Sequence, residues 1–132
     1  MTRFWIKISD GVDFAFKNIL RMKGGEIFIP KIPSVKIIEI AKLFKKNIKL
    51  KQIGLRPGEK LHEVLLSKDS AHHSLEFNKY FVIIPEFNFE KKKNFSFYEK
   101  NNKGKKLPEG FEYNSFNNPE YLTEKQLRKI KY

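Results

Sequence analysis

Strand-like and helix-like apolar patterns alternate over the first half of this 132-residue chain, and the alternation restricts the folds open to it. A β-rich run at 3–8 comes first. It precedes apolar residues at helical spacing up to Leu20, with Ser9 as the expected N-cap and Gly24-Gly25 as the stop. The first pattern is therefore a strand followed by a helix.

Two further pairs of the same kind follow. A short strand at 26–29 leads into a second helix, which opens at Pro33-Ser34 and continues to Phe44. The alternating run at 48–53 is typical of a half-buried strand, and a third helix is expected to carry Leu61, Val64 and Leu65. Three such pairs predict an α/β fold rather than a helical bundle or a β-sandwich.

The second half of the sequence is less periodic. Residues 80–84 predict a strand, and 100–106 predict an exposed turn. Residues 123–126 match a capping box that opens a short C-terminal helix. Alternate aromatic residues suggest short edge strands at Phe87, Phe89, Phe95 and Phe97.

The formal net charge of +12 invites the hypothesis of a nucleic-acid partner. However, only four of the 27 basic residues are Arg, and Lys, Asn, Ile and Phe all have A/T-rich codons. We therefore attribute most of the charge to compositional background and expect no nucleic acid. An alternative stays open: a Lys-rich, non-catalytic module that binds polyanions, such as nucleic acid or acidic polysaccharide, through Lys91–Lys93 and Lys103–Lys106. A further alternative is that the chain is a non-catalytic structural remnant.

Other classes of site find little support in the sequence. The chain has no Cys, which excludes disulfides and Cys-based zinc sites, and His72-His73 lacks a third ligand at suitable spacing, so no metal is expected. Its apolar runs are far shorter than the about 20 residues that span a bilayer. The first residues also lack the features of a signal peptide. A cytoplasmic protein without a membrane partner is the resulting expectation.

The loop Arg56-Pro57-Gly58-Glu59 is the first candidate site, because it is predicted between a strand and a helix. An Arg at such a place can bind a diphosphate, and a Glu can accept hydrogen bonds from sugar hydroxyls. Equally, Pro57-Gly58 can form a tight turn while Glu59 favours the first helical turn. Arg3, one of few arginines, is a weaker candidate, and the residues alone leave both interpretations open.

Tyr121 and Lys125 have the spacing of the acid/base pair of short-chain dehydrogenases. The capping box places Tyr121 before the helix, and no Gly-rich dinucleotide loop follows a strand upstream. We therefore interpret the match as accidental. His62 is expected to be a structural side chain, and no catalytic residue is assigned.

Several of these segments together resemble one enzyme family. The resemblance is to the C-terminal part of the inverting UDP-N-acetylglucosamine 4,6-dehydratases, which are extended short-chain dehydrogenase/reductase (SDR) enzymes of polysaccharide biosynthesis. It extends to about Pro85, and beyond that only the tail is similar. The segments that carry it are Met1–Trp5, Gly24–Phe28, Pro30–Ser34, Gly54–Glu63 and, in the tail, Asn118–Leu122.

The resemblance implies a substrate-side part of such an enzyme, without its N-terminal Rossmann domain. It places Arg56 near the diphosphate and Glu59 near the ribose of UDP-N-acetylglucosamine, with Arg3 as a second phosphate-facing residue. The complete enzyme is expected to use NADP, to form a homo-oligomer and to act on UDP-N-acetylglucosamine in the biosynthesis of a bacterial surface polysaccharide or pseudaminic acid. Catalysis by this chain alone is not expected. The predicted division is a substrate-binding lobe at 1–85, an irregular Lys/Asn/Phe-rich segment at 86–118, and a tail with a short helix at 119–132.

Overall fold

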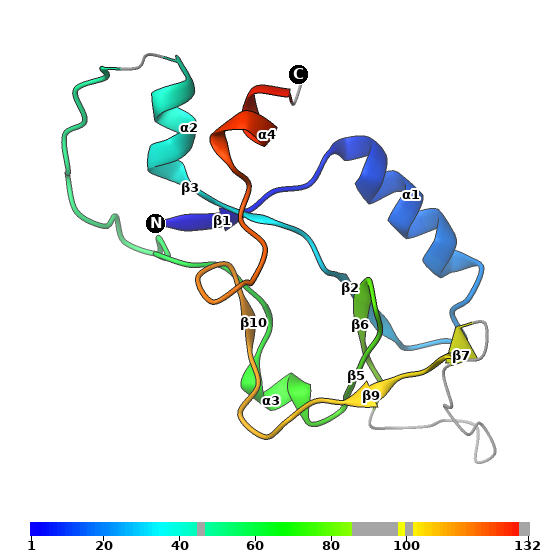
Figure 1. Cartoon of the computed structure of the whole chain (residues 1–132). Helices are drawn as coiled ribbons and strands as arrows, with labels where there is room; N and C mark the ends of the chain where they lie inside the picture. The colour runs from blue at the N-terminus through cyan, green and yellow to red at the C-terminus, as the bar shows by residue number, and fades with distance from the viewer. Residues whose placement is uncertain (45–46, 86–97, 100–101, 130–132) are drawn as a thin grey trace. The chain divides into compact units, whose positions relative to one another are not determined.

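The computed structural model describes residues 1–44, 47–85, 98–99 and 102–129, which belong to two units (Figure 1). Each unit combines segments that are distant in sequence. Unit 1 contains Met1–Ile6, Ile32–Val64 and Tyr113–Tyr132, and unit 2 contains Lys7–Lys31 and Leu65–Glu112.

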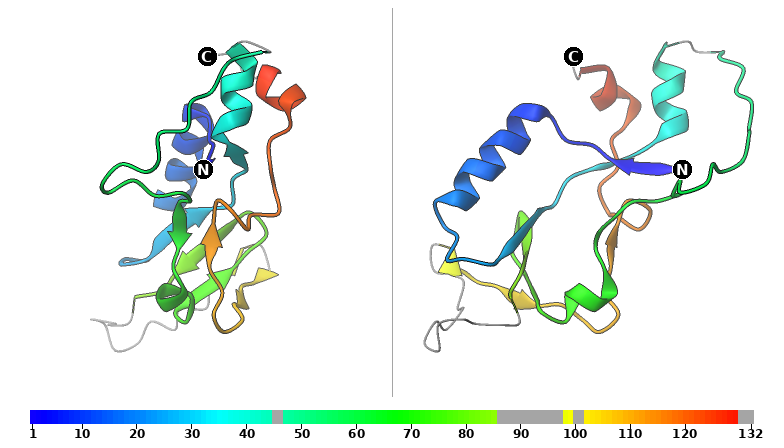
Figure 2. Two further views of the ribbon diagram at one scale, coloured as in Figure 1. Left: turned by 90° about the vertical axis from the view of Figure 1, so that its left-hand side faces the viewer. Right: turned by 180° about the vertical axis from the view of Figure 1, so that it is seen from behind.

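Unit 1 is organised around a short antiparallel strand pair. Strand β1 (Thr2–Phe4) pairs with β3 (Ser34–Lys36), so that Arg3 lies opposite Val35, which is fully buried. Helix α2 (Ile37–Phe44) follows β3 directly and packs against α4 (Glu124–Lys129), and the two helices lie side by side in Figures 1 and 2. The N-terminal residues are thus joined to segments from the middle and the end of the chain.

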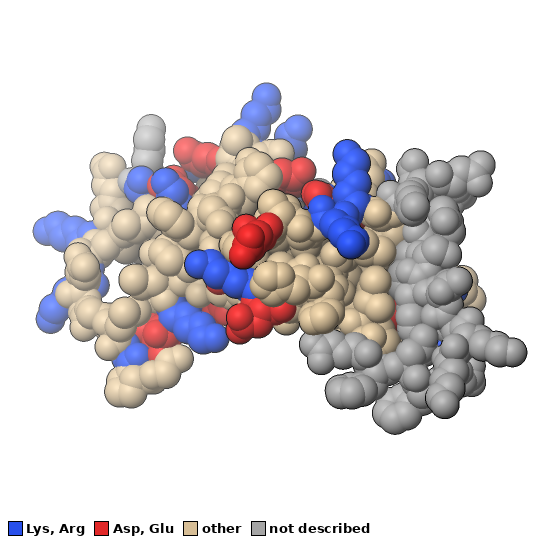
Figure 3. All heavy atoms as spheres, turned by 90° about the horizontal axis from the view of Figure 1, so that it is seen from below, with Lys and Arg blue, Asp and Glu red and all other residues tan. Residues whose placement is uncertain are grey.

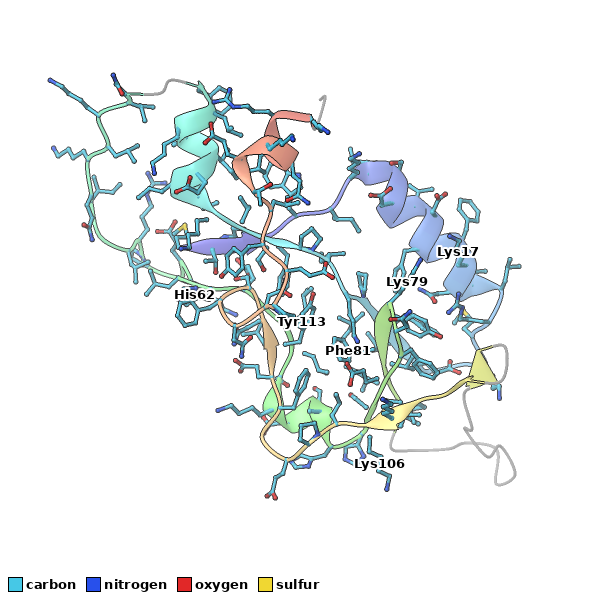
Figure 4. All side chains as sticks on the ribbon, in the orientation of Figure 1. Lys17, His62, Lys79, Phe81, Lys106 and Tyr113 are labelled. Atoms are coloured by element: carbon cyan, nitrogen blue, oxygen red, sulfur yellow. The ribbon has the colours of Figure 1, made fainter. Side chains whose placement is uncertain are left out.

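The remaining parts of unit 1 are held by side chains that bond to backbone. Tyr113 lies on β10 (Tyr113–Asn114), and its hydroxyl both donates to the carbonyl and accepts from the amide of Ile32, each at 2.9 Å (Figure 4). The Asn118 side chain donates to the same carbonyl at 2.8 Å and to the Ser34 hydroxyl at 2.9 Å. These bonds hold the returning C-terminal segment beside β3.

Unit 2 is built on an antiparallel sheet with the strand order β2-β6-β5-β9. Its core cluster combines aromatic and aliphatic side chains: Phe77, Tyr80 and Val82 are buried, and Phe14 from helix α1 (Ile8–Ile19) packs against them. The other elements of the unit are β2 (Ile27–Pro30), α3 (Lys68–Ala71), β5 (Ser74–Glu76), β6 (Tyr80–Ile83), β7 (Tyr98–Glu99), β8 (Asn102–Lys103) and β9 (Lys105–Lys106). Strand β4 (Val64–Leu66) begins at the last residue of a unit 1 segment.

Several of the predicted elements are confirmed. The strands expected at 26–29 and 80–84 are β2 and β6, and the first helix is α1. In the capping box before α4, the Thr123 amide donates to the Gln126 side chain at 2.8 Å, and the Gln126 amide donates to the Thr123 hydroxyl at 3.3 Å. In these elements, the local sequence pattern and the packing against distant residues favour the same structure.

The predicted boundaries near the N-terminus are partly wrong. The first strand ends at Phe4, and Lys7 rather than Ser9 is the N-cap of α1. Ser9 lies within the first turn of the helix, where its hydroxyl donates to the adjacent Asp10 carboxylate. The second helix begins at Ile37 instead of Pro33-Ser34, since Ser34–Lys36 are paired with β1 as a strand. Pairing between distant segments prevails over the local helix-start signal.

The third predicted pair is wrong. Residues 48–53 form no strand and are exposed, and the expected third helix is replaced by β4, which contains Val64 and Leu65. The expected turn at 100–106 includes β8 and β9, and Lys100 lies outside the described residues. The edge strands expected at Phe87, Phe89, Phe95 and Phe97 also lie outside them, and the boundaries at residues 85 and 118 stay predictions.

We predict that Tyr113→Phe lowers the free energy of unfolding by about 1–2 kcal/mol, because the Ile32 amide loses its acceptor. Burial raises the pKa of the Tyr113 phenol above 10.0, the hydrogen bond with Ile32 opposes the rise, and the charge of Glu120 adds to it. A pKa higher in the folded state means that this stabilisation is complete below pH 10 and is lost as the pH rises through the folded value.

Urea unfolding at several alkaline pH values measures this effect. The difference in stability between wild type and Tyr113→Phe should shrink above pH 10. A constant difference across the alkaline range would contradict the assigned role of the phenol.

Candidate functional site

Residues Arg56–Glu59 form a tight turn. The Glu59 amide donates to the Arg56 carbonyl at 3.0 Å, and the Arg56 amide donates to Oε2 of Glu59 at 3.1 Å. Gly58 has φ +80°, which suits glycine in the third position of a type II turn after Pro57. The tight-turn interpretation of the sequence is confirmed.

The setting predicted for this turn is wrong. No helix follows Glu59: the chain has no regular structure between Glu59 and β4, which begins at Val64. The turn therefore offers no helix N-terminus to an anion, and Glu59 does not belong to a first helical turn. Instead, residues 47–61 are all exposed, so that the side chains of Arg56 and Glu59 stand at the surface.

Arg3 is bonded to the segment that directly follows the turn. Its Nη1 donates to the carbonyls of Thr2 at 2.7 Å and Leu61 at 3.3 Å, and its Nη2 donates to the carbonyl of Lys60 at 2.9 Å. Its Nε forms an ion pair with Glu63 at 3.2 Å. The structure thus brings Arg3 beside the chain that carries Arg56 and Glu59, with most of its N–H groups already bonded.

Thr2 and Ser115 hold the same segment from within unit 1, and no local sequence pattern indicates either residue. The Thr2 amide donates to the Leu61 carbonyl at 2.9 Å, and its hydroxyl contacts Nδ1 of His62 at 2.8 Å and Oγ of Ser115 at 2.7 Å. Ser115, which is fully buried, bonds in both directions with the backbone of Glu63. The partners lie 60 and 113 positions from Thr2, which is why periodicity cannot reveal them.

His62 has the structural environment that was expected for it. Its ring packs against Phe116, with the ring centroids 4.5 Å apart, while Nδ1 faces Thr2 (Figure 4). Tyr121 precedes α4, as predicted, and its hydroxyl donates to the carbonyls of Ser115 and Phe116. Tyr121 and Lys125 therefore do not share a helix, which supports the interpretation of their spacing as accidental.

Other kinds of site receive no support from the described residues. Among them, no group of three or more His, Cys, Asp or Glu residues is placed to hold a metal ion. None of the helices in the described ranges is both long and apolar enough to cross a bilayer. On the face shown in Figure 3, acidic side chains lie among the basic ones, and Lys91–Lys93 lie outside the described residues.

Comparison with known proteins identifies the family. A family profile described as polysaccharide biosynthesis protein matches residues 1–85. The chain belongs to this polysaccharide biosynthesis family. The matched range contains Arg3, Arg56 and Glu59, so that all three candidate residues lie in the part of the chain that defines the family.

Two relatives from Campylobacter jejuni are similar over nearly the whole chain. Both are inverting UDP-N-acetylglucosamine 4,6-dehydratases, from serotypes O:2 and O:23/36, and they are 50% and 47% identical over 131 residues. These matches cover 98% of this chain and 39% of each relative. The chain therefore spans about two fifths of the length of these relatives, as expected for a part of such an enzyme.

A solved structure agrees with this assignment. The crystal structure of Pen from Bacillus thuringiensis has a TM-score of 0.71 and 26% identity to this chain. The match covers 97% of this chain and 36% of Pen. Together with the dehydratase matches, it confirms the α/β class and agrees with the expected C-terminal part of an extended SDR enzyme. Because the relatives belong to sugar biosynthesis, they do not favour the polyanion-binding alternative.

Proposed function

We propose that this chain supplies the UDP-sugar-binding part of a UDP-N-acetylglucosamine 4,6-dehydratase. The observation that carries the proposal is the identity of 50% to an inverting enzyme of that activity over 98% of the chain. The product is proposed to enter the synthesis of a bacterial surface polysaccharide or pseudaminic acid in the cytoplasm.

Within this site, Arg56 is proposed to bind the diphosphate and Glu59 the ribose. The two side chains project from one turn, whose backbone geometry is fixed by two mutual hydrogen bonds. Both are exposed, so that a ligand can reach them without unfolding the loop. The guanidinium fork matches phosphate oxygens, and the second oxygen of the Glu59 carboxylate is available to sugar hydroxyls.

The complete enzyme is proposed to use NADP, which would accept a hydride from the sugar and return it after water is lost. The residues described here do not fit such a cofactor. Gly24, Gly25, Gly54 and Gly58 adopt positive φ angles in turns, but none of these turns joins a strand to a helix N-terminus in the way that a dinucleotide loop does. We therefore assign cofactor binding and catalysis to the remaining part of the enzyme.

We predict that Arg56→Ala weakens the binding of UDP-N-acetylglucosamine by about tenfold or more, because charge-assisted hydrogen bonds contribute about 1.5–3 kcal/mol. Titration calorimetry, supplemented by NMR for weak binding, measures the dissociation constant. Lys51→Ala is the matched control, since it removes another exposed positive charge from the same loop. Equal losses in the two variants would indicate nonspecific charge attraction, and unchanged binding by Arg56→Ala would refute the role of Arg56.

The partner that we propose is the remaining part of such a dehydratase. Helix α1 and its C-cap residue carry an exposed apolar stripe, defined as Ile8, Val12, Phe16 and the C-cap Leu20. Ile8 is 87% exposed, Phe16 65% and Leu20 89%. An unpartnered stripe of this kind suits a covering domain, and the chain spans only 39% of the length of its relatives, which leaves room for one.

We predict that Phe16→Gln weakens the association of this chain with the remaining part of the Campylobacter jejuni O:2 relative supplied in trans. Lys17→Gln, at the adjacent exposed position of the same helix, should leave the association unchanged. Co-elution in size-exclusion chromatography is the measurement. Undiminished co-elution of Phe16→Gln, or no co-elution with the wild-type chain, would contradict the proposed interface.

A further inference from the structure

We propose that Thr2 and Arg3 act as a clamp on residues 60–63 and thereby position the Arg56–Glu59 turn for its ligand. This makes Arg3 a positioning residue, in place of the direct phosphate contact expected from the family resemblance. The inference deepens the proposed function and rests on it.

The Arg3 guanidinium is already bonded to groups of the protein itself. A guanidinium has five N–H groups. At Arg3 these groups face three carbonyl oxygens, those of Thr2, Lys60 and Leu61, and one carboxylate, that of Glu63. The side chain is 25% exposed, so that it is mostly withdrawn from solvent. A phosphate would have to displace these bonds, whereas a positioning role requires them.

Two neighbouring residues of unit 1, Thr2 and Ser115, hold the segment. Thr2 bonds to it through its amide, which donates to Leu61, and through its hydroxyl, which contacts His62. Ser115 bonds to both the amide and the carbonyl of Glu63, at 2.9 and 2.8 Å. Thr2 and Ser115 are themselves bonded through their hydroxyls and are buried. Residues 60–63 are thus fixed to the interior of unit 1.

Arg3 is the central residue of β1 and lies opposite Val35, which is fully buried in the strand pair with β3. The guanidinium therefore extends from a backbone that long-range pairing holds in place. Because the backbone of Arg3 is held in this way, the hydrogen bonds of its side chain fix the position of residues 60–63 relative to β1.

The clamp directly adjoins the turn. The two hydrogen bonds within the turn run between Arg56 and Glu59, and the residues of the turn are exposed, so that these bonds fix its shape but not its position. The position of the turn is therefore set by the segment to which it is joined. This segment begins at Lys60, the first residue that the clamp holds. Because displacement by about 1 Å can cost a site a large part of its function, this anchoring matters for ligand binding.

The test compares Arg3→Lys, Arg56→Ala and the double variant for binding of UDP and of uridine. Lysine keeps the positive charge but cannot bond to three acceptors in a fork. We expect Arg3→Lys to weaken UDP by about tenfold and uridine by a smaller but measurable factor, because displacement of the turn affects both Arg56 and Glu59, whereas uridine contacts Glu59 alone. In the Arg56→Ala background, the effect of Arg3→Lys on UDP should be clearly smaller than in the wild type.

A measurement without ligand accompanies the binding data. Arg3→Lys should accelerate hydrogen exchange of the Glu63 amide and shift the amide resonances of Arg56 and Glu59 in NMR spectra. Arg128→Lys is the matched control, because Arg128 forms an exposed ion pair with Glu124 in α4. This control should leave the resonances of the turn unchanged.

The possible outcomes separate the two proposals. If Arg3→Lys weakens UDP alone, or if its effect adds fully to that of Arg56→Ala, Arg3 contacts phosphate directly and the clamp is refuted. Unchanged exchange at Glu63 and unchanged turn resonances would also refute it. If instead Arg56→Ala binds UDP as well as the wild type does, the proposed function fails, while the exchange data still decide whether the clamp exists.

Discussion

The bonding of Thr2 and Arg3 to residues 60–63 is the interaction on which the candidate site depends. It joins the first strand of the chain to an exposed segment about 60 positions away, and Ser115 completes the junction from the C-terminal side. Most of the bonds use backbone carbonyls and amides, whose burial without partners would be costly. The result is an exposed loop whose charged side chains are attached to a buried support.

The sequence predicted those features that depend on local chemistry. The Pro57-Gly58 turn is present, because glycine permits φ +80° and proline favours the preceding position. The capping box before α4 is also present, since both of its hydrogen bonds lie within residues 123–126. In each case the residues that determine the structure are neighbours in the sequence, and the patterns could therefore be interpreted correctly.

The features that were missed depend on distant residues. Ser34–Lys36 look like a helix start but form a strand, because β1 offers a pairing partner. The alternation at 48–53 resembles a strand but is exposed, and the expected helix around Val64 is β4. The bonds of Arg3 were missed for the same reason, since its acceptors lie 57 and 58 positions away. The family resemblance predicts that the loop at 56–59 is a site, and the structure supplies the interactions that hold this loop.

The division of labour that we propose between this chain and the rest of a dehydratase rests on the same observations. The described residues provide charged groups on an anchored turn but no dinucleotide loop, and the exposed stripe on α1 suits a covering domain. The proposed binding of the UDP moiety is therefore the property that can be tested on this chain by itself. The high net positive charge of the chain does not account for this proposed binding, because Arg56 is the only basic residue in the turn Arg56–Glu59.

A titration of the isotope-labelled chain with UDP, followed by NMR, tests the central claim most directly. If the turn binds the nucleotide, the amide resonances of Arg56, Gly58 and Glu59 should shift together and saturate with a single dissociation constant. Saturating shifts confined to other residues, such as Lys105 and Lys106, or shifts at the turn that grow without saturation, would contradict it.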